Sequence, residues 1–418
     1  MKILIVGNGA REHALAWKIK QSKKVSRLFV SPGNAGTEQI ATNVDLNDIE
    51  QIVNWSQTNK IDLVVVGPDS YLSEGLVNKL ESLDIKVFGP TKEASEIEWS
   101  KAFAKEFMQR ESIPTARYRA FTSSSDARNY IRNESYPLVI KASGLAFGKG
   151  VVIAQSISEA EEAIEQMMDS KIFGESGSEV IIEEYLHGLE ISTHAFCDGE
   201  NVVMFPASQD RKRIFENDTG PNTGGMGTIA PVKEVTKEQL EEIKNKVVLP
   251  TVRGLNKMGR TFKGVLFPGI MLTADGPKVI EFNARFGDPE TQSYMRILET
   301  DLVDIMLSCA DGNLDKQELI WSDKYACSIV LASKGYPGKY EKNEEITIKI
   351  PLSADVELFH AGTTLKGDRL VSNGGRVLNV TNVGNSLAEA LEGAYDAIEN
   401  VNFEGKQYRK DIGVKRFS

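Results

Sequence analysis

Short apolar runs alternate with amphipathic stretches through the first hundred residues of the chain. The predicted strands lie at 2–6, 28–30, 62–66 and 86–88, and the predicted helices between them lie at 12–20, 49–58 and 74–83. Strands that alternate with helices favour a parallel, doubly wound sheet. Ligands of such sheets bind at the carboxyl ends of the strands.

Three of these strand ends carry glycine-rich turns, at 7–9, 33–36 and 67–69. The first turn has Gly7 and Gly9 but lacks the third glycine of a dinucleotide fingerprint, and no acidic residue follows the second strand. Backbone N–H groups at these turns therefore suit a phosphosugar better than NAD. The alternative is that all three turns have only a structural role.

The middle of the chain mixes helical and strand patterns. Its predicted helices lie at 101–110, 126–133, 158–168 and 238–258, and its predicted strands lie at 117–121, 138–140, 151–153, 179–186, 202–206 and 262–273. Pro250 predicts a kink in the long helix. The polar, glycine-rich segment 207–228 is predicted to be irregular. Long irregular segments in compact domains are usually either functional lids or disordered segments.

A glycine-rich loop at 144–150 separates two of these strands. Its spacing differs from a Walker A loop, because three residues separate Gly144 from Gly148 and Lys149 precedes Gly150. A strand–loop–strand flap with lysines can still cover a triphosphate. A mobile hairpin with solvated lysines is the alternative.

The segment 279–292 places Glu281, Asn283 and Arg285 two residues apart on a predicted strand, so their side chains share one face. A carboxylate and an amide oxygen are ligands that Mg²⁺ accepts, and a guanidinium can bind phosphate oxygens. The alternative is a solvated sheet face with a Glu–Arg pair. From about residue 324 the pattern becomes β-rich, with one capped helix at 387–399.

Composition narrows the class of protein. The chain has 418 residues, 41% hydrophobic and 26% charged, which fits about two to four globular domains. A net charge of −10 argues against nonspecific nucleic-acid or anionic-membrane binding. The three cysteines form no CxxC pair, no apolar run approaches a membrane span, and the first residues predict a strand rather than a signal peptide. We expect a cytoplasmic protein with small-molecule substrates and neither a nucleic-acid nor a membrane partner.

Seven segments together resemble one known family. They lie at 7–18, 32–37, 140–151, 218–227, 281–292, 360–365 and 373–378. By the order and the residues of these segments, such as EFNARFGDPETQ at 281–292, the chain resembles the phosphoribosylamine–glycine ligase family of the ATP-grasp superfamily. The resemblance implies a parallel doubly wound N-terminal α/β domain at 1–100 and an ATP-grasp α+β domain at 101–323. It also implies a mobile flap subdomain at about 116–188 and a β-rich domain at 324–418.

The resemblance further implies a reaction. ATP would phosphorylate the carboxylate of glycine, and the amine of 5-phosphoribosylamine would displace phosphate from glycyl phosphate, giving glycinamide ribonucleotide in the second step of purine synthesis. The implied cofactors are ATP and Mg²⁺ or Mn²⁺. We expect a monomer with this one activity. A different ATP-grasp ligase or carboxylase, and a catalytically idle nucleotide-binding regulator, are the competing hypotheses.

Roles for individual residues follow from the same resemblance. Glu281 and Asn283 are the implied metal ligands, and Arg285, Lys212 and Asp210 the implied catalytic residues, the last two beside the 220–227 loop. The residues implied for ATP are Lys101, Lys141, Gly144, Gly148, Lys149, Gly150, Glu183, Glu184, Tyr185, Leu186 and Glu190. Those implied for the substrates are Gly9, Glu12, Asn34, Gly36, Gly67, Pro68, Asp69, Gly287 and Asp288.

Five positions depart from the pattern of the family. They are Ser143, Phe147, Asp69, His187 and Leu189. The first two lie in the flap and are expected to alter ATP affinity or flap closure, and Asp69 shortens one substrate contact by a methylene. None replaces Glu281, Asn283 or Arg285, so activity is expected to be retained.

Overall fold

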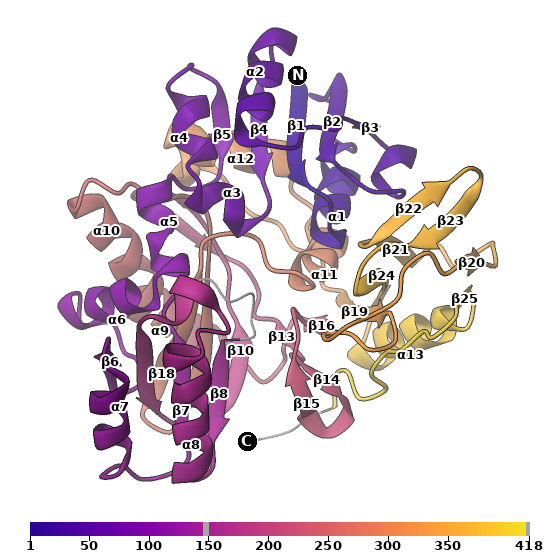
Figure 1. Ribbon diagram of the computed structural model, residues 1–418. Helices are drawn as coiled ribbons and strands as arrows, with labels where there is room; N and C mark the ends of the chain where they lie inside the picture. The colour runs from indigo at the N-terminus through magenta and orange to yellow at the C-terminus, as the bar shows by residue number, and fades with distance from the viewer. Residues whose placement is uncertain (145–149, 415–418) are drawn as a thin grey trace.

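The structure is a computed structural model, and it describes residues 1–144 and 150–414. Figure 1 shows the N-terminal unit at the top, the flap subdomain at the lower left and the β-rich C-terminal unit at the right. The predicted positions Gly148 and Lys149 and the departure Phe147 lie outside the described residues.

The N-terminal unit is the predicted parallel sheet. In spatial order its strands are β3 (Thr42–Asn43), β2 (Arg27–Pro32), β1 (Lys2–Gly7), β4 (Leu63–Val66) and β5 (Lys86–Phe88). Every pairing is parallel. The apolar residues of β1 and β4 are buried because helices cover both faces of a parallel sheet. Those helices include α1 (Ala10–Ile19) and α2 (Ile49–Asn59).

One predicted helix of this unit is wrong. Instead of one helix at 74–83, the structure has α3 (Asp69–Ser73) and α4 (Leu76–Glu81). Gly75 separates them with a φ of +85°, a left-handed conformation that a helix interior cannot contain. Two further helices follow, α5 (Lys92–Trp99), which was not predicted, and α6 (Lys101–Arg110), which begins where predicted under the cap of Ser100.

The central domain is built on an antiparallel sheet. Its strands, in order, are β10 (Leu189–Ser192), β17 (Lys263–Thr273), β11 (Ala195–Asp198) and β12 (Val202–Met204), and β18 (Gly276–Asn283) pairs with β17. The predicted long helix is present as α9 (Lys237–Ile243) and α10 (Leu249–Lys257), joined by a π-helical turn. The turn precedes Pro250, which has no N–H for a regular helical bond. After β18 come α11 (Glu290–Ile297) and α12 (Leu302–Asp311).

The flap subdomain has its own antiparallel sheet and its own apolar core. The strands, in order, are β6 (Tyr118–Phe121), β9 (Val180–Glu184), β7 (Leu138–Ala142) and β8 (Val151–Ala154). Two helices, α7 (Ser124–Ile131) and α8 (Ile157–Ile164), pack their buried residues against this sheet. β9 continues toward β10, so the subdomain and the central sheet meet at residues 184–189.

The C-terminal sheet includes strands from the middle of the chain. Its order is β13 (Gln209–Asp210), β16 (Gly227–Ala230), β19 (Tyr325–Ala332), β24 (Arg376–Gly384) and β21 (Val356–His360), with α13 (Leu387–Ile398) packed on it. β14 (Arg213–Phe215) and β15 (Thr219–Asn222) form a hairpin between β13 and β16. The prediction that 207–228 is irregular is therefore wrong, because short strands occupy much of it. β22 (Thr363–Lys366) pairs with β23 (Arg369–Ser372), beside β2 and β3 in Figure 1.

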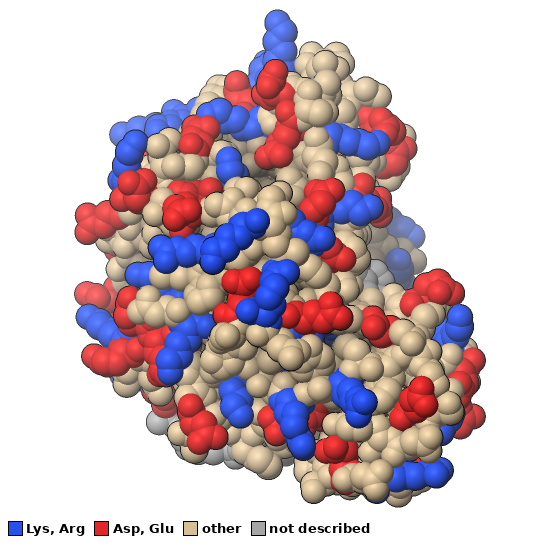
Figure 2. Space-filling view, turned by 90° about the vertical axis from the view of Figure 1, so that its left-hand side faces the viewer, with Lys and Arg blue, Asp and Glu red and all other residues tan. Residues whose placement is uncertain are grey.

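No helix in the described part of the chain is long and apolar enough to cross a membrane. On the face shown in Figure 2, lysine and arginine side chains are interspersed with aspartate and glutamate. Neighbouring charges of opposite sign reduce the field that this face projects into solvent.

Candidate active site

The end of β18 carries the predicted metal ligands. Glu281 and Asn283 lie two residues apart on the strand, as predicted, whereas β18 ends before Arg285. Arg285 turns back and donates from a terminal nitrogen to Asn283 Oδ1 over 3.3 Å. The carboxylate, the amide oxygen and the guanidinium therefore lie together although only two of them belong to the strand.

Lys212 lies beside Glu281. Its Nζ is 3.1 Å from Glu281 Oε1 and 3.3 Å from Glu190 Oε1, so one ammonium bridges two carboxylates from different strands. Lys212, despite burial that opposes its charge, has a pKa held well above the usual value by Glu281, Glu190 and Asp210. In turn Lys212 is the largest cause that lowers the pKa of Glu281 to about 2. Glu281 is therefore ionised at neutral pH, as a metal ligand must be.

A second group of charges surrounds Glu183 on β9. Glu183 Oε2 is 3.0 Å from Lys141 Nζ, and Glu183 Oε1 is 3.2 Å from Lys105 Nζ. Lys141 also donates to the carbonyl oxygen of Ile280 over 2.9 Å, next to Glu281. This places Lys141 between the flap subdomain and β18. Glu183 is buried, and its carboxylate contacts both Lys141 and Lys105.

The root of the flap is anchored to α6. Lys101 N donates to Ser143 O over 2.9 Å, and Lys101 Nζ lies 3.5 Å from Gly144 O. Ala102 N donates to Ser143 Oγ over 3.1 Å. Ser143, one of the departures from the family pattern, thus accepts a hydrogen bond from a second free N–H group in the first turn of α6, beside the cap that Ser100 provides. On the other side of the loop, Ala142 N donates to Gly150 O over 2.9 Å.

The linker 184–186 leaves β9 partly buried and leads to β10, which carries Glu190. Glu184 Oε1 accepts from the N–H of Arg117 over 2.9 Å. The ring of Tyr185 meets the ring of His187 edge to face, with centroids 4.9 Å apart. The linker therefore joins the flap sheet to the strand whose Glu190 contacts Lys212.

In the N-terminal unit, the side chain of Glu12 lies between the turns that follow β1 and β4. Its Oε2 accepts from Gly9 N over 2.7 Å, and its Oε1 is 2.7 Å from Arg11 Nε. A side chain at Gly67 would lie 1.9 Å from Glu12 Oε1, so the 67–69 turn needs glycine to pass this carboxylate. Both carboxylate oxygens of Glu12 have protein donors, and Asp69 follows at the start of α3.

Asn34 ties the second glycine turn to the C-terminal unit. Its Nδ2 donates to Asn8 O over 2.9 Å and to His360 O over 2.8 Å, while its Oδ1 accepts from Gly36 N. A side chain at Gly36 would strike the rings of His13 and His360. The turn 33–36 is therefore held between α1 and β21.

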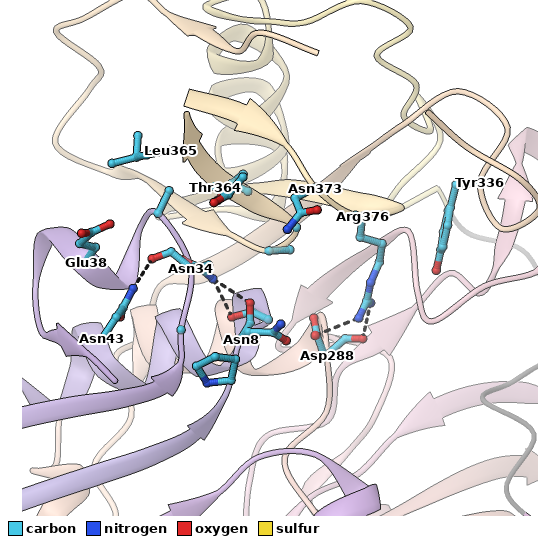
Figure 3. A pocket seen from close by; sticks show the side chains of 18 residues that line it. Asn8, Asn34, Glu38, Asn43, Asp288, Tyr336, Thr364, Leu365, Asn373 and Arg376 are labelled. Atoms are coloured by element: carbon cyan, nitrogen blue, oxygen red, sulfur yellow. Dashed lines mark hydrogen bonds and ion pairs between the residues drawn. The ribbon is translucent and has the colours of Figure 1, made fainter. Parts of the chain in front are cut away.

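A cavity of about 440 Å³ opens between this turn and the C-terminal strands. Of the predicted substrate residues, Gly9, Asn34 and Asp288 line it. The following predicted residues are not part of its lining: Glu12, Gly36, Gly67, Pro68, Asp69 and Gly287. Figure 3 shows that the opposite wall comes from Thr364, Asn373, Arg376 and Tyr336 of the C-terminal unit, to which the sequence assigned no role.

Arg376 closes one end of this cavity. Its terminal nitrogens lie 2.9 Å from Asp288 Oδ2 and 2.7 Å from Asp288 O, and one of them also donates to Gly224 O over 2.8 Å. Burial raises the pKa of Asp288, but Arg376 is the first of several cations that outweigh it and hold that pKa below its usual value. One side chain thus joins the C-terminal sheet, the 220–227 loop and the turn before α11. The motif at 373–378 contained this residue, but only the fold shows its partners.

Asp210 lies beneath the 220–227 loop, and Glu290 lies close to it. Its Oδ1 is buried and accepts no hydrogen bond among the described residues. Burial, and then repulsion from Glu290, raise the pKa of Asp210 well above its usual value. Glu290 Oε1 accepts from Ser192 Oγ over 3.0 Å. A side chain at Gly225 would lie 2.9 Å from Asp210 Oδ1, so glycine is required for the loop to pack over this carboxyl group.

The three parts of the chain match three family domains in order. Residues 1–98 match the phosphoribosylglycinamide synthetase N domain, 99–291 its ATP-grasp (A) domain and 326–415 its C domain. A curated phosphoribosylamine–glycine ligase from Caldanaerobacter subterraneus is 47% identical, covering 99% of this chain and 100% of its own.

Solved structures agree with this assignment. The crystal structure of phosphoribosylamine–glycine ligase from Thermotoga maritima has a TM-score of 0.85 and 35% identity, covering 99% of this chain and 100% of its own. The biotin carboxylase domain of a 2-oxoglutarate carboxylase from Hydrogenobacter thermophilus, solved with MgADP, shares the fold at a TM-score of 0.75 and 18% identity, covering 97% of this chain and 91% of its own. With the family domains matched in sequence and a full-length relative at 47% identity, the chain belongs to the phosphoribosylglycinamide synthetase family.

Proposed function

We propose that this chain joins glycine to 5-phosphoribosylamine with ATP, giving glycinamide ribonucleotide, ADP and phosphate in purine biosynthesis. The observation that carries the proposal is the charge arrangement at the end of β18. There Lys212 contacts Glu281 and Arg285 contacts Asn283, inside a chain whose full-length relative is a phosphoribosylamine–glycine ligase. In the first step a carboxylate oxygen of glycine attacks the γ-phosphorus of ATP and ADP leaves. In the second, the substrate amine attacks the carbonyl carbon, phosphate leaves and the amine nitrogen loses a proton.

Phosphoryl transfer depends on positioning and on neutralising charge. Lys141 and Lys101 lie at the flap root, where an ammonium can approach a triphosphate that the flap covers. Arg285 lies beside Asn283 and remains charged. Burial opposes that charge, but Glu98 and other nearby carboxylates outweigh it and hold the pKa of Arg285 above the usual value. We assign these three cations to the phosphates of ATP and of glycyl phosphate. The linker 184–186 and Glu190 would hold adenine and ribose.

Glu281 and Asn283 would hold the divalent cation, for which we propose Mg²⁺ or Mn²⁺. The donors fit a hard cation, since Glu281 is ionised and Asn283 offers an amide oxygen. Within residues 1–144 and 150–414 no three His, Cys, Asp or Glu side chains gather as a metal cage, so phosphate and water oxygens would complete the coordination. A cation bound there would neutralise the charge that develops on the transferred phosphoryl group.

The carboxyl groups of Asp210 and Glu290 would bind the ammonium group of the substrate glycine. Repulsion from Glu290 contributes to the raised pKa of Asp210, and a cation between the two groups would relieve that repulsion. Lys212, which interacts with both Asp210 and Glu281, would face the glycine carboxylate. We propose that glycine binds between Asp210 and Lys212 under the 220–227 loop.

The cavity between the N-terminal turns and the C-terminal strands would hold phosphoribosylamine. It is lined by glycine-rich turns, asparagines and one arginine, which suit a sugar phosphate. Glu12, Gly67 and Asp69 would act by shaping the turns beside it. We further propose a cytoplasmic monomer with domains at 1–100, 101–323 and 324–418.

The experiment that tests the reaction measures ADP release by the purified protein. Phosphoribosylamine is formed in place from ribose 5-phosphate and ammonia, and Mg²⁺-ATP is supplied with and without glycine. ADP release that depends on both glycine and phosphoribosylamine is the expected result. Release that ignores glycine would assign another carboxylate substrate, and no release above background would reject the reaction.

A further inference from the structure

Glu98, a residue outside the site predicted from the sequence, contacts the segment that carries Arg285. It lies on α5 and is 8% exposed. Its Oε1 is 3.0 Å from Arg285 Nε, and its Oε2 accepts from the N–H of Ala284 over 2.7 Å. One carboxylate therefore holds the side chain of Arg285 and the backbone of the residue before it.

The other contacts of Arg285 leave its orientation dependent on Glu98. Its terminal nitrogens donate to Asn283 Oδ1 over 3.3 Å and to Phe286 O over 3.2 Å. Both are neutral acceptors at long distance, and Asn283 is itself a proposed metal ligand. The contact with Glu98 is shorter and joins opposite charges, which makes it the strongest of the three.

β18 ends before Arg285, so no strand pairing fixes this residue. An arginine side chain has many rotamers, and ordering it costs entropy unless a partner selects one of them. A cation that stabilises a transferred phosphoryl group acts only if it is held where the charge develops. From these contacts we propose that Glu98 is a positioning residue that holds Arg285 toward the phosphoryl group during the reaction. This inference rests on the proposed function.

The position of Glu98 also links Arg285 to the N-terminal unit. α5 packs against α3, which begins at Asp69. Burial raises the pKa of Glu98 above its usual value although Arg285 lowers it, and Asp69 repels the same carboxylate. Glu98 thus interacts with both the strand-end turn at 67–69 and the catalytic arginine, and a substrate charge near Asp69 would act on the pair.

The test compares Glu98→Gln with Glu96→Gln. Glutamine keeps the size of the side chain, but its amide carries one oxygen, so either Arg285 Nε or Ala284 N–H loses its acceptor. Glu96 lies on the same helix and pairs with Arg260, which makes it a matched control. We expect kcat for glycine-dependent ADP release to fall about 10-fold to 100-fold in Glu98→Gln. The KM of this variant for ATP should stay within about threefold of the KM of the unchanged protein. Glu96→Gln should retain kcat.

A double-mutant cycle separates positioning from a general structural role. If Glu98 acts through Arg285, Glu98→Gln should lower kcat by less than about threefold once Arg285→Lys is present, because lysine has no Nε–H for Glu98 to hold. Trapping of glycyl phosphate with hydroxylamine should show the loss at phosphoryl transfer. If Glu98→Gln fails to fold, Glu98→Asp serves instead, since the shorter carboxylate cannot reach both donors.

Two outcomes would overturn the inference. The first is an unchanged kcat in Glu98→Gln. The second is a loss of the same size whether or not Arg285→Lys is present, which would show that the two residues act independently. Both tests require that the unchanged protein releases ADP with glycine. Its failure to do so would reject the proposed function instead, so the two failures are distinguishable.

Discussion

The site contains two groups of lysine and carboxylate side chains in which the balance of charge is opposite. Around Lys212, one ammonium faces the carboxylates of Glu281 and Glu190. Around Glu183, one carboxylate faces the ammonium groups of Lys105 and Lys141. The first group raises the pKa of its lysine well above the usual value, whereas Lys105 in the second has a pKa lowered to about 8.

The difference teaches that the ratio of charges, rather than burial alone, sets the state of these lysines. Burial opposes the charge on both Lys212 and Lys105. For each lysine it is the largest single contribution to the pKa, and it lowers that pKa. Lys212 has enough carboxylates to overcome that cost, but Lys105 must share Glu183 with Lys141. The excess of carboxylates around Lys212 suits the proposed binding site of the divalent cation. The excess of ammonium groups around Glu183 suits the proposed binding site of the ATP phosphates.

The largest effect is expected from Glu183→Gln. This change removes the carboxylate that both buried lysines contact, and removing one partner of a buried ion pair costs about 3–5 kcal/mol of stability. Urea denaturation measures it, with Glu184→Gln as the control because its side-chain oxygen can still accept from Arg117 N. A loss below about 1 kcal/mol would mean that the two lysines lose their charge at little cost.

In the other group, Glu281→Gln should lower glycine-dependent ADP release about 100-fold or more, because the charged ligand that we propose for the divalent cation is lost. Lys212 keeps Glu190 as a partner, so the fold should be retained. The rate is measured over a range of Mg²⁺ concentrations, with Glu238→Gln at an exposed position as the control. Full activity at ordinary Mg²⁺ would contradict the assignment of Glu281 as a metal ligand.

A smaller effect is expected from Asp210→Asn. The asparagine keeps the shape of the site but cannot form the carboxylate that a bound glycine ammonium would stabilise, so KM for glycine should rise about 10-fold while KM for ATP changes little. Steady-state kinetics with each substrate varied in turn measures both, and Asp275→Asn on an exposed turn is the control. Equal changes in both KM values would point to a general disturbance of the loop instead.

The smallest effect concerns the pH dependence of stability. Lys105 has a pKa of about 8 in the folded protein, below the unfolded value of about 10.4, so the unfolded state binds more protons between these values. The contribution of Lys105 to the free energy of unfolding is therefore lowest below pH 8, and it rises as pH increases toward about 10. Lys105→Met leaves Lys141 and Glu183 balanced and should lessen that rise. Urea denaturation from about pH 7 to about pH 10 checks it, with Lys23→Met as the control, and an unchanged rise would assign it to other groups.

Local pattern was enough to predict the elements that carry most of the site. The parallel sheet, the start of α6 at Lys101 and the placement of Glu281 and Asn283 on β18 all follow from apolar spacing and capping residues. The predicted helix at 74–83 failed because Gly75 adopts a left-handed conformation, and Gly at one position within a helical pattern does not by itself predict a break.

Contacts between distant segments could not be predicted in the same way. Glu98 accepts from Ala284, 186 positions further along the chain, only because α5 folds over the end of β18. Arg376 reaches Asp288 from the C-terminal sheet, and Lys105 shares Glu183 with Lys141 across three elements. The residues themselves were visible in the sequence, but their partners depend on tertiary packing, which apolar periodicity does not encode.

The C-terminal sheet has a consequence for protein engineering. β16 pairs with β19, although the two strands fall on either side of a boundary between matched family domains. A chimera that exchanged residues 326–415 alone with a relative would place a foreign β19 against the native β16 and would have to preserve the packing of Ile412 over Gly227. The unit that can be exchanged as one piece therefore includes the 209–230 segment together with the C-terminal strands, and recombination points chosen from the linear domain boundaries would cut through a continuous sheet.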